Sequence, residues 1–420
     1  MPTLDLQGHF YLPDHPGQHV PGFLTFSTAE GGTLTLIGEL PEPDTEQSRI
    51  IGQTPGNVYT LEDCFQTFGD HSQGKQVLRV QRLVVSATYG KDEPITADQL
   101  SIQLANLTHW VQSAGYGNAI QSDDRAQRHS RWAITSDPIQ PLTVSIPQGN
   151  LRLEQGRGLT GDGITSRTLT QDAWFHVEFN DMLPLADVID LASDLQDLVS
   201  IGTDRPATFE RFLLWHPDFQ HEMPDGQTMP EPVEYLAQWK AQPSERDDPP
   251  NDYHMLFTFA ELGGMDAVAT WLNVAAKYRS MLGAAMSTSY ERRMFVEDRL
   301  LDRMAALEGF HRVRTGMNDL SLQARLRDLT ELAGPPFEQL VGDVAVWRRR
   351  ARDERDNIAH HKGRPAHQSS GEMYFTAEAA YWLFVLCMLR EMPARQPVFD
   401  HITRCQRFGW AEEKLKSILG

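Results

Sequence analysis

The sequence predicts a multidomain α+β protein in which a β-rich first part precedes an all-α helical bundle. Three observations lead to this fold class. Short apolar runs separated by glycine and proline fill residues 1–180, and apolar residues at helical spacing dominate residues 251–420. The segment between them is helical at first and then rich in proline. At 420 residues the chain is too long for one ordinary core, so we expect two or three domains.

The first part, residues 1–180, has the pattern of short strands joined by tight turns. Turn residues such as Pro13, Pro16–Gly17 and Gly31–Gly32 separate its apolar runs. Many short strands at this spacing are typical of a β-sandwich or a jelly-roll. The expected strands lie within residues 8–12, 22–26, 33–37, 76–86, 142–146 and 174–179.

The second segment, residues 181–250, is predicted to be a helical and proline-rich connector. Ala186–Val199 places apolar residues at helical spacing and acidic residues on the opposite face. Residues 217–250 contain seven prolines and many charges, which favours a loop or linker over a core element. We place the domain boundary near Pro249–Pro250.

The third segment, residues 251–420, is predicted to be entirely helical. Its connections are short, which favours an antiparallel bundle of about four to six helices. Pro336 suits the first turn of a helix. The clearest helices are expected over residues 265–287, 289–314, 321–329, 336–357 and 372–391.

Composition points to a globular protein of the cytoplasm, with 40% hydrophobic and 23% charged residues. No apolar run reaches the ~18 residues of a membrane span, and the N-terminus has no basic leader, so we expect neither a membrane partner nor a signal peptide. The three cysteines, Cys64, Cys387 and Cys405, are odd in number and far apart. They predict neither a disulfide framework nor a zinc cluster, and they favour a reducing compartment.

The negative charge of the chain is confined to its first part. The net charge is −19. Residues 1–250 hold 35 Asp and Glu against 15 Lys and Arg, a balance of −20, and residues 251–420 hold 22 against 23, a balance of +1. An acidic surface repels nucleic acid, so a polyanion is expected to bind the second part if it binds the chain at all.

One short stretch combines side chains suited to phosphate binding and to proton transfer. Arg355 is followed by Asp356 and Asn357, and then by the adjacent His360 and His361. An arginine holds a phosphate through paired, charge-assisted hydrogen bonds, and a histidine is the side chain best suited to move a proton near pH 7. An enzyme that cuts RNA without a metal needs one of each.

Basic residues flank this motif on both sides and are the candidate RNA-binding residues. A solvated helix face is the alternative interpretation of such a run. Its position beside the motif favours the binding of a polyanion such as RNA. The flanking basic residues are Arg348, Arg349, Arg350, Arg352, Lys362 and Arg364.

Arg355 and His360 point in different directions if one straight helix carries both, since five residues turn by about 140° at ~100° per residue. They converge if the helix ends between them, and Gly363 and Pro365 are ordinary stop signals. They also converge if two chains share one site. The second arrangement predicts a homodimer through the helical domain, with the motif at a two-fold interface.

Structural roles are the alternatives for these residues. Arg355 suits a surface salt bridge within its helix, and a histidine at a helix C-terminus is favoured by the helix dipole. Adjacent histidines such as His360 and His361 point apart, and no H-E-x-x-H motif is present, so we expect no metal and no cofactor. The sequence also contains no P-loop and no serine-hydrolase elbow.

Two regions resemble known families. Arg355-Asp356 followed by His360 near the end of a late helix resembles the arginine–polar–histidine motif of the HEPN superfamily. Phe295–Arg312 resembles the helix with a leucine-glutamate-aromatic-histidine signature in ApeA-like HEPN domains. The segments at 8–13, 21–26, 31–38 and 51–64 resemble the ApeA N-terminal domain, whose bearers are anti-phage defence factors. The resemblance covers most of the chain and is least distinctive over residues 200–255.

The resemblance implies a metal-independent endoribonuclease that halts translation in an infected cell, an abortive-infection outcome. Its expected substrate is tRNA or other structured or single-stranded RNA. A base would remove the proton of a ribose 2′-hydroxyl, which attacks the adjacent phosphate. His360 is the candidate general acid or base, with His361 as its rival, and Arg355 would hold the phosphate. Asp356 or Asn357 would orient the histidine or bind the ribose.

A second function stays open beside this one. The helical region would then be a non-catalytic HEPN module for binding or dimerisation, and the N-terminal domain would sense a ligand or a phage product. If the chain is a nuclease, the β-rich domain would sense a phage-derived trigger or shield the basic region with its negative charge. The intact arginine–histidine pair favours the nuclease, because a purely structural module has no need of both residues.

Overall fold

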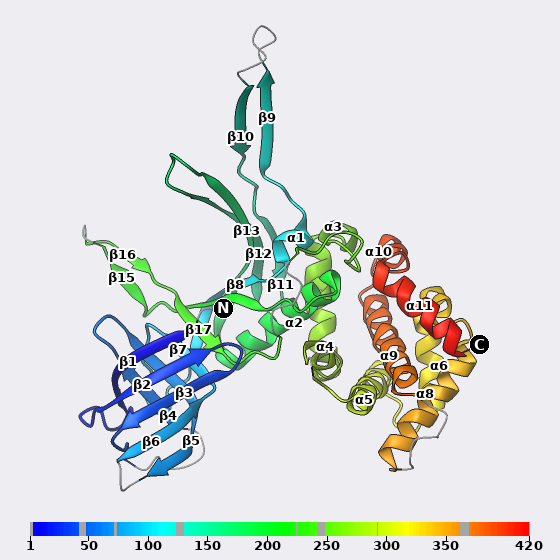
Figure 1. Ribbon diagram of the computed structural model, residues 1–420, viewed down its shortest axis with the longest axis horizontal. Helices are drawn as coiled ribbons and strands as arrows, with labels where there is room; N and C mark the ends of the chain where they lie inside the picture. Colours follow the sequence, from blue (N-terminus) through cyan, green and yellow to red (C-terminus); the bar gives the residue numbers. More distant parts are fainter. Residues whose placement is uncertain are drawn as a thin grey trace.

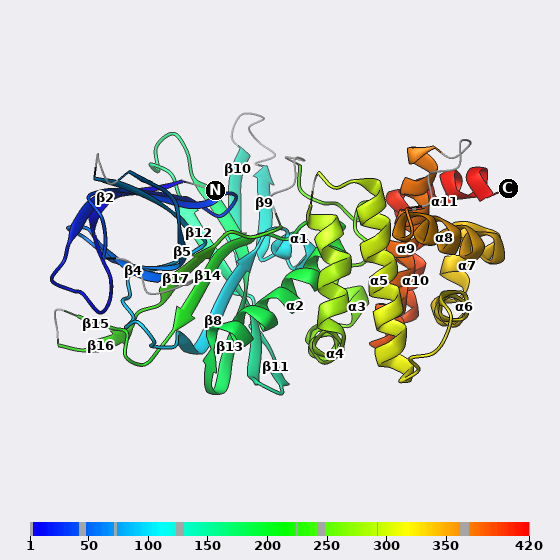
Figure 2. The same cartoon turned by 90° about the horizontal axis from the view of Figure 1, so that it is seen from below.

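Strands fill the first part of the molecule and helices the second, as the sequence predicts (Figures 1 and 2). The structure is a computed structural model, and it describes residues 3–41, 48–70, 74–122, 130–223, 226–241, 248–291, 293–361 and 369–419. Strands occur between residues 4 and 237, and the helical region spans residues 259–419. The α+β fold class is therefore confirmed.

The first six strands close into a small antiparallel barrel in place of the expected pair of packed sheets. They are β1 (Leu4–Tyr11), β2 (Val20–Ser27), β3 (Gly31–Ile37), β4 (Ser48–Gln53), β5 (Val58–Asp70) and β6 (Lys75–Val80). The pairs run β5–β4–β1–β2–β3–β6, and β6 returns to β5. Closure removes the unpaired strand edges that a sandwich leaves. Figure 2 shows this ring of strands nearly end-on.

Alternating burial along the strands fills the barrel. In β2, Leu24 and Phe26 point inward and are each 1% exposed, whereas Phe23, which directly precedes Leu24, points outward and is 46% exposed. Inward apolar residues of the other barrel strands complete a core that is separate from the rest of the molecule. The barrel is therefore a separately packed unit.

A second, open antiparallel sheet extends from β5. Its strands are β7 (Arg82–Val85), β8 (Thr96–Leu104), β11 (Leu142–Ile146), β12 (Gly149–Thr160), β13 (Thr168–Pro184), β14 (Phe209–Trp215) and β17 (Val233–Ala237). Their order from β5 is β7-β17-β14-β8-β13-β12-β11. The predicted helix after β13 is present as α2 (Leu185–Thr203), whose apolar residues Leu191 and Leu195 share a core with this sheet. The short helix α1 (Leu107–Val111) follows β8.

The proline-rich segment carries more regular structure than the sequence predicts. β17 pairs with β14 and β7, and Val233, Tyr235 and Ala237 are buried at alternate positions. The strand fits because Val233–Ala237 contains no proline, so no ladder hydrogen bond is lost. Two further hairpins project from the sheet (Figure 1). They are β9 (Tyr116–Ser122) with β10 (Ser130–Ser136), and β15 (Gln220–Glu222) with β16 (Thr228–Pro230).

The helical region surrounds one buried helix, α9. Of the described helices α9 alone is long and apolar enough to cross a membrane, but 83% of its apolar window is buried inside the fold, as in a core helix. The helices are α3 (Phe259–Leu262), α4 (Met265–Tyr290), α5 (Val296–Thr315), α6 (Leu322–Ala333), α7 (Pro335–Val341), α8 (Val344–Ala359), α9 (Ser370–Glu391), α10 (Gln396–Ile402) and α11 (Gln406–Leu419).

Two expected helices have different bounds in the structure. The helix predicted over residues 336–357 is divided into α7 and α8, because Gly342 has a φ of +70° and ends the first. Asp343 then caps α8, accepting hydrogen bonds from the amides of Ala345 and Val346 at 2.9 Å each. The helix predicted from residue 289 begins as α5 only at Val296.

One continuous core joins the second sheet to the helical region. Trp271 of α4 donates a hydrogen bond to the Asp194 carbonyl oxygen of α2 at 2.8 Å, and buried residues on both sides of Pro249–Pro250 belong to this core. The barrel and α8 lie toward opposite ends of the long axis in both views (Figures 1 and 2). Within one chain, therefore, the barrel does not cover the basic residues of α8.

Candidate active site

Helix α8 ends between the arginine and the histidines of the motif. Its last residue is Ala359, and His360 follows as the C-cap with a φ of −107° and a ψ of 12°. The His360 amide still donates to the Asp356 carbonyl oxygen at 3.1 Å, and the His361 amide donates to the Ile358 carbonyl oxygen at 3.1 Å. His361 has a φ of +51°, in the left-handed region that few residues other than glycine adopt. The helix end predicted from the sequence is therefore confirmed.

Both histidine side chains are exposed at this helix end. Neither His360 nor His361 forms a side-chain hydrogen bond or an ion pair with another described residue. A neutral imidazole has one donor and one acceptor nitrogen, and no other side chain among the described residues occupies these atoms in either ring. The structure leaves both histidines as candidates for proton transfer.

Arg355 is held by two carboxylates. Its Nη2 donates to Glu308 Oε1 of α5 at 3.0 Å, and its Nη1 donates to Asp356 Oδ1 at 3.1 Å. The Arg355 side chain is 31% exposed, and that of Glu308 is 12% exposed. The contact with Glu308 holds the guanidinium against α5, and part of the guanidinium stays open to solvent. A phosphate that binds Arg355 has to compete with these carboxylates.

Glu308 is the residue of this site that the sequence motif alone does not reveal. It lies on α5, 47 positions before Arg355, and it also accepts a hydrogen bond from Arg312 at 3.3 Å. Its signal was the leucine-glutamate-aromatic-histidine pattern at residues 307–311. That pattern indicated a helix of a known type, and the structure adds that its glutamate contacts the motif arginine.

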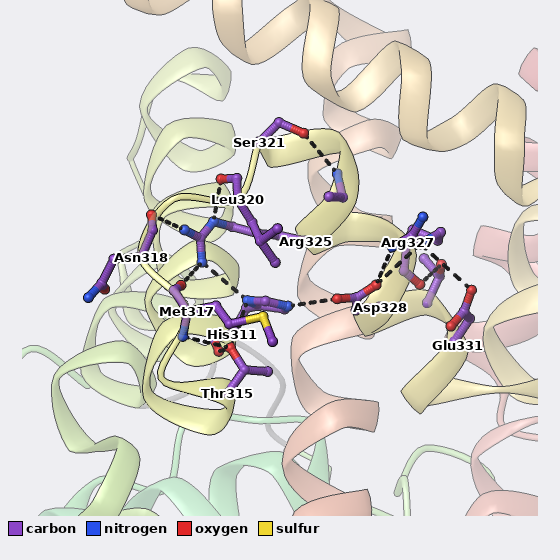
Figure 3. A network of polar contacts seen from close by, with 12 residues as sticks. His311, Thr315, Met317, Asn318, Leu320, Ser321, Arg325, Arg327, Asp328 and Glu331 are labelled. Carbon is purple, nitrogen blue, oxygen red and sulfur yellow. Dashed lines mark hydrogen bonds and ion pairs between the residues drawn. The ribbon is translucent and has the colours of Figure 1, made fainter.

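His311, the last residue of the same pattern, connects the end of α5 to α6 (Figure 3). The ring is buried, with Nε2 3.1 Å from Asp328 Oδ2 and Nδ1 3.1 Å from Arg325 Nη1. Because arginine only donates, Nδ1 accepts and Nε2 carries the proton that Asp328 accepts. Both ring nitrogens are thus occupied, which gives His311 a structural role. Arg325 also donates to three carbonyl oxygens of the α5–α6 loop, those of Met317, Asn318 and Leu320.

Asp356 and Asn357, the two polar residues after the arginine, are both half-buried. The Asp356 carboxylate contacts the Arg355 guanidinium. Among the described residues it makes no hydrogen bond to the His360 ring. In this structure Asp356 therefore positions the arginine and leaves the histidine unconstrained.

Arg350 is the most constrained of the basic residues ahead of the motif. It donates to Glu354 Oε1 at 2.7 Å and to Glu372 Oε2 of α9 at 2.6 Å. Burial lowers the pKa of Arg350, but Glu372 and Glu354 raise it by more. Arg350 therefore joins α8 to α9 and has little capacity left for a phosphate.

The other basic residues differ in how open they are. Arg349 is exposed, Arg348 is half-buried, and Arg352 contacts its neighbour Asp353 at 2.5 Å. Lys362 and Arg364 lie outside the described residues. Arg349 is therefore the most accessible cation of the described run.

Metal-ligand geometry is not found in the part of the chain that the structure describes. No three His, Cys, Asp or Glu side chains there are grouped so as to hold a metal ion. The three cysteines are buried and separate, and burial raises the pKa of the Cys405 thiol to about 11. The guanidinium and imidazole groups near the end of α8, those of Arg355, His360 and His361, are suited to phosphate binding and proton transfer.

The fold and this helix end define a protein that joins a β-rich N-terminal region to a helical region with an exposed arginine–histidine motif. Residues 5–271 match the model of a family described as ApeA N-terminal domain 1. The chain belongs to this family, and it is an ApeA-like anti-phage defence protein. The matched range takes in the barrel, the second sheet, α2 and the start of α4. No curated protein and no solved structure is found to match the chain.

Proposed function

We propose that the chain is a metal-independent endoribonuclease that protects against phage by abortive infection. The observation that carries this proposal is the end of α8, where exposed His360 and His361 follow a helix whose Arg355 is fixed against α5 and partly open to solvent. A guanidinium that binds phosphate and an imidazole that moves a proton are sufficient for RNA cleavage by a 2′-hydroxyl. A nuclease that halts translation by cutting RNA would act in the cytoplasm, where translation takes place.

The reaction needs one proton removed and one delivered. An imidazole takes the proton of the ribose 2′-hydroxyl, the 2′-oxygen attacks the adjacent phosphorus, and the bond from phosphorus to the 5′-oxygen breaks. A second imidazole, His361 or the His360 of a second chain, gives the 5′-oxygen its proton. Arg355 binds the phosphate and stabilises the charge that grows on it. The products are a 2′,3′-cyclic phosphate and a 5′-hydroxyl, and loops of tRNA or other unpaired RNA allow the in-line geometry.

A homodimer through the helical region completes the proposed site. A two-fold contact at the end of α8 would bring two copies of Arg355 and His360 into one groove. The sharpest test mixes the Arg355→Ala and His360→Ala chains under conditions that exchange subunits. Recovery of cleavage in the mixture supports a shared site, and a mixture as inactive as its components would contradict it.

The test in cells compares the parent chain with Arg355→Ala, His360→Ala and His361→Ala, with and without phage, by sequencing RNA 5′ ends. We expect new 5′-hydroxyl ends only with phage and only in chains that keep the catalytic pair. Arg293→Ala, at an exposed arginine distant in sequence from the motif, is the matched control. Equal protection by all variants would overturn the nuclease proposal.

A non-catalytic module for RNA or protein binding is the second candidate. The two carboxylates that contact Arg355 favour this second candidate, because they already neutralise the positive charge that would attract a phosphate. The Glu308→Gln variant separates the two candidates. Removing this carboxylate strengthens RNA binding in either case, but only a nuclease yields cyclic phosphate ends in excess EDTA.

Control of the nuclease would begin in the β-rich region with a phage-derived trigger. The barrel does not reach α8 within one chain, so a signal would pass through the shared core of the second sheet, α2 and α4. A fragment that begins at residue 251 would expose that core. Control is therefore better tested on the full chain, by asking whether barrel-surface substitutions abolish cleavage during infection without lowering stability.

A further inference from the structure

Two adjoining cavities lie where the end of α2 meets α4, α5, α9 and α11. The smaller has a volume of about 160 Å³ and the larger about 360 Å³. Asp204, Tyr374 and Arg407 line both. Together the cavities have a size typical of sites for small molecules.

The smaller cavity has an excess of positive charge, in a chain whose net charge is −19. Four guanidinium groups line it against two carboxylates. These side chains come from the end of α2 and from α5, α9 and α11. The charged residues are Arg205, Arg299, Arg303, Arg407, Asp204 and Glu378.

Glu378 holds two of these arginines in place. It accepts from Arg303 at 2.6 Å and from Arg407 at 2.6 Å, and Arg407 also contacts Asp204. The side chains of Arg303 and Glu378 are each 2% exposed. Burial raises the pKa of Glu378, but Arg407 and Arg303 lower it by more, to about 2, so the carboxylate is ionised at neutral pH. The cationic wall is therefore rigid.

Arg299 is the member of this wall that lacks an acceptor. Among the described residues it has no ion pair and no hydrogen bond, and its Nε is buried. Its guanidinium carbon lies 6.0 Å from the centre of the Tyr374 ring. A buried donor without an acceptor destabilises the unliganded protein, and a bound anion would supply the missing acceptor.

The larger cavity offers a different chemistry. It is lined by Tyr374, Trp410 and His254, and the His254 Nδ1 is buried without a hydrogen-bond partner among the described residues. Trp410 is 45% exposed, so part of its ring surface is open. Aromatic rings beside an unsatisfied polar atom suit a planar heterocycle that stacks and hydrogen-bonds.

We propose that these two cavities form a site for a nucleotide, with the phosphate against Arg299 and the base beside Trp410 and His254. This site is distinct from the end of α8 and does not depend on nuclease activity. Its walls come both from α2, which lies within the matched family region, and from the helical bundle. A bound nucleotide would therefore link the β-rich region to the helices that carry the candidate active site.

The test is calorimetric titration of the full chain with AMP, ATP, GMP, GTP, adenosine and inorganic phosphate. We expect at least one nucleotide to bind more tightly than both adenosine and phosphate. Arg299→Gln should weaken that binding by about tenfold or more, which corresponds to the loss of one charge-assisted contact. Arg293→Gln, at an exposed arginine of the same region, should leave it unchanged.

Three outcomes would overturn the site. They are the absence of binding by every nucleotide at millimolar concentration, equal binding by Arg299→Gln and Arg293→Gln, and phosphate binding as tight as that of the nucleotides. Because Arg299 has no ion-pair partner among the described residues, Arg299→Gln should fold as the parent does. Its thermal unfolding midpoint, measured beside the titration, confirms that a loss of binding is local.

Discussion

Two arginine–carboxylate clusters in this molecule use the same side chains in opposite settings. At the junction of α2 with the bundle, Arg303 and Glu378 are each 2% exposed. At the end of α8, Arg355 is 31% exposed and Glu308 is 12% exposed. A buried ion loses its partner only at a large cost in free energy, whereas a partly exposed arginine can exchange a carboxylate for a phosphate. Burial therefore decides which pair is structural and which is available for function.

The largest effect on stability is expected at the buried pair. Glu378→Gln leaves the buried Arg303 without a carboxylate partner and Arg407 with Asp204 alone, so the free energy of unfolding should fall by about 3–5 kcal/mol. Urea unfolding measures it. Glu372→Gln, whose side chain is 36% exposed and contacts Arg350, is the matched control and should cost under about 1 kcal/mol. Equal losses at both positions would contradict the distinction by burial.

Asp197 sharpens the comparison, because it is a buried carboxyl that no described guanidinium contacts. Its Oδ1 accepts from the Tyr290 hydroxyl at 2.5 Å. Burial raises its pKa to about 8; the Tyr290 hydrogen bond opposes this rise and Asp194 adds to it. The unfolded chain releases this proton near pH 4 and the folded chain near pH 8, so Asp197 lowers stability increasingly as the pH rises between these values.

Asp197→Asn should remove this penalty while keeping the hydrogen bond from Tyr290. The free energy of unfolding of the variant should exceed that of the parent, and the difference should grow by up to roughly 1.4 kcal/mol for each pH unit between about 4 and 8. Urea unfolding at pH 5 and at pH 8 measures the gain. If the difference between variant and parent is the same at both pH values, Asp197 is already ionised in the folded chain and the account of its burial is wrong.

Arg355→Gln tests the exposed cluster with the same method. The change removes two contacts of a partly exposed side chain, so we expect a loss of under about 1 kcal/mol in unfolding free energy. Glu308→Gln should have an effect of similar size. A loss of several kcal/mol at Arg355 would make it a structural residue and would favour the non-catalytic module.

The smallest effect is expected at Arg349, which is exposed and lies on the basic run of α8. Arg349→Gln should leave the urea midpoint unchanged and weaken RNA binding uniformly across sequences. The slope of log affinity against log salt should fall by about 1 if Arg349 contacts a phosphate. An unchanged slope would place the RNA elsewhere on the helical region.

The helices were more predictable than the sheet, for physical reasons. The spacing of apolar residues predicts a helix over Glu372–Glu391, and the structure shows it as α9, which begins two residues before the expected start. The break between α7 and α8 depends on one glycine with positive φ, which periodicity does not show. The barrel closes because β6 pairs with β5, and such a pairing cannot be predicted from the sequence of either strand alone.

The candidate site was predictable only in its local part. Arg355, His360 and His361 lie within one short motif, and the helix end between them follows from nearby stop signals. The contact of Arg355 with Glu308 joins positions 47 residues apart, and that of Arg303 with Glu378 joins positions 75 apart. Such contacts are set by tertiary packing, so a single sequence contains the residues but not their pairing.

The most direct test of the central claim is RNA cleavage in excess EDTA by the full chain purified from phage-infected cells. The parent chain should leave 2′,3′-cyclic phosphate and 5′-hydroxyl ends. Arg355→Gln and at least one of His360→Ala and His361→Ala should cut at least about 100-fold more slowly, with unfolding midpoints close to the parent's. Undiminished cleavage by folded Arg355→Gln would contradict the claim that the end of α8 is the active site.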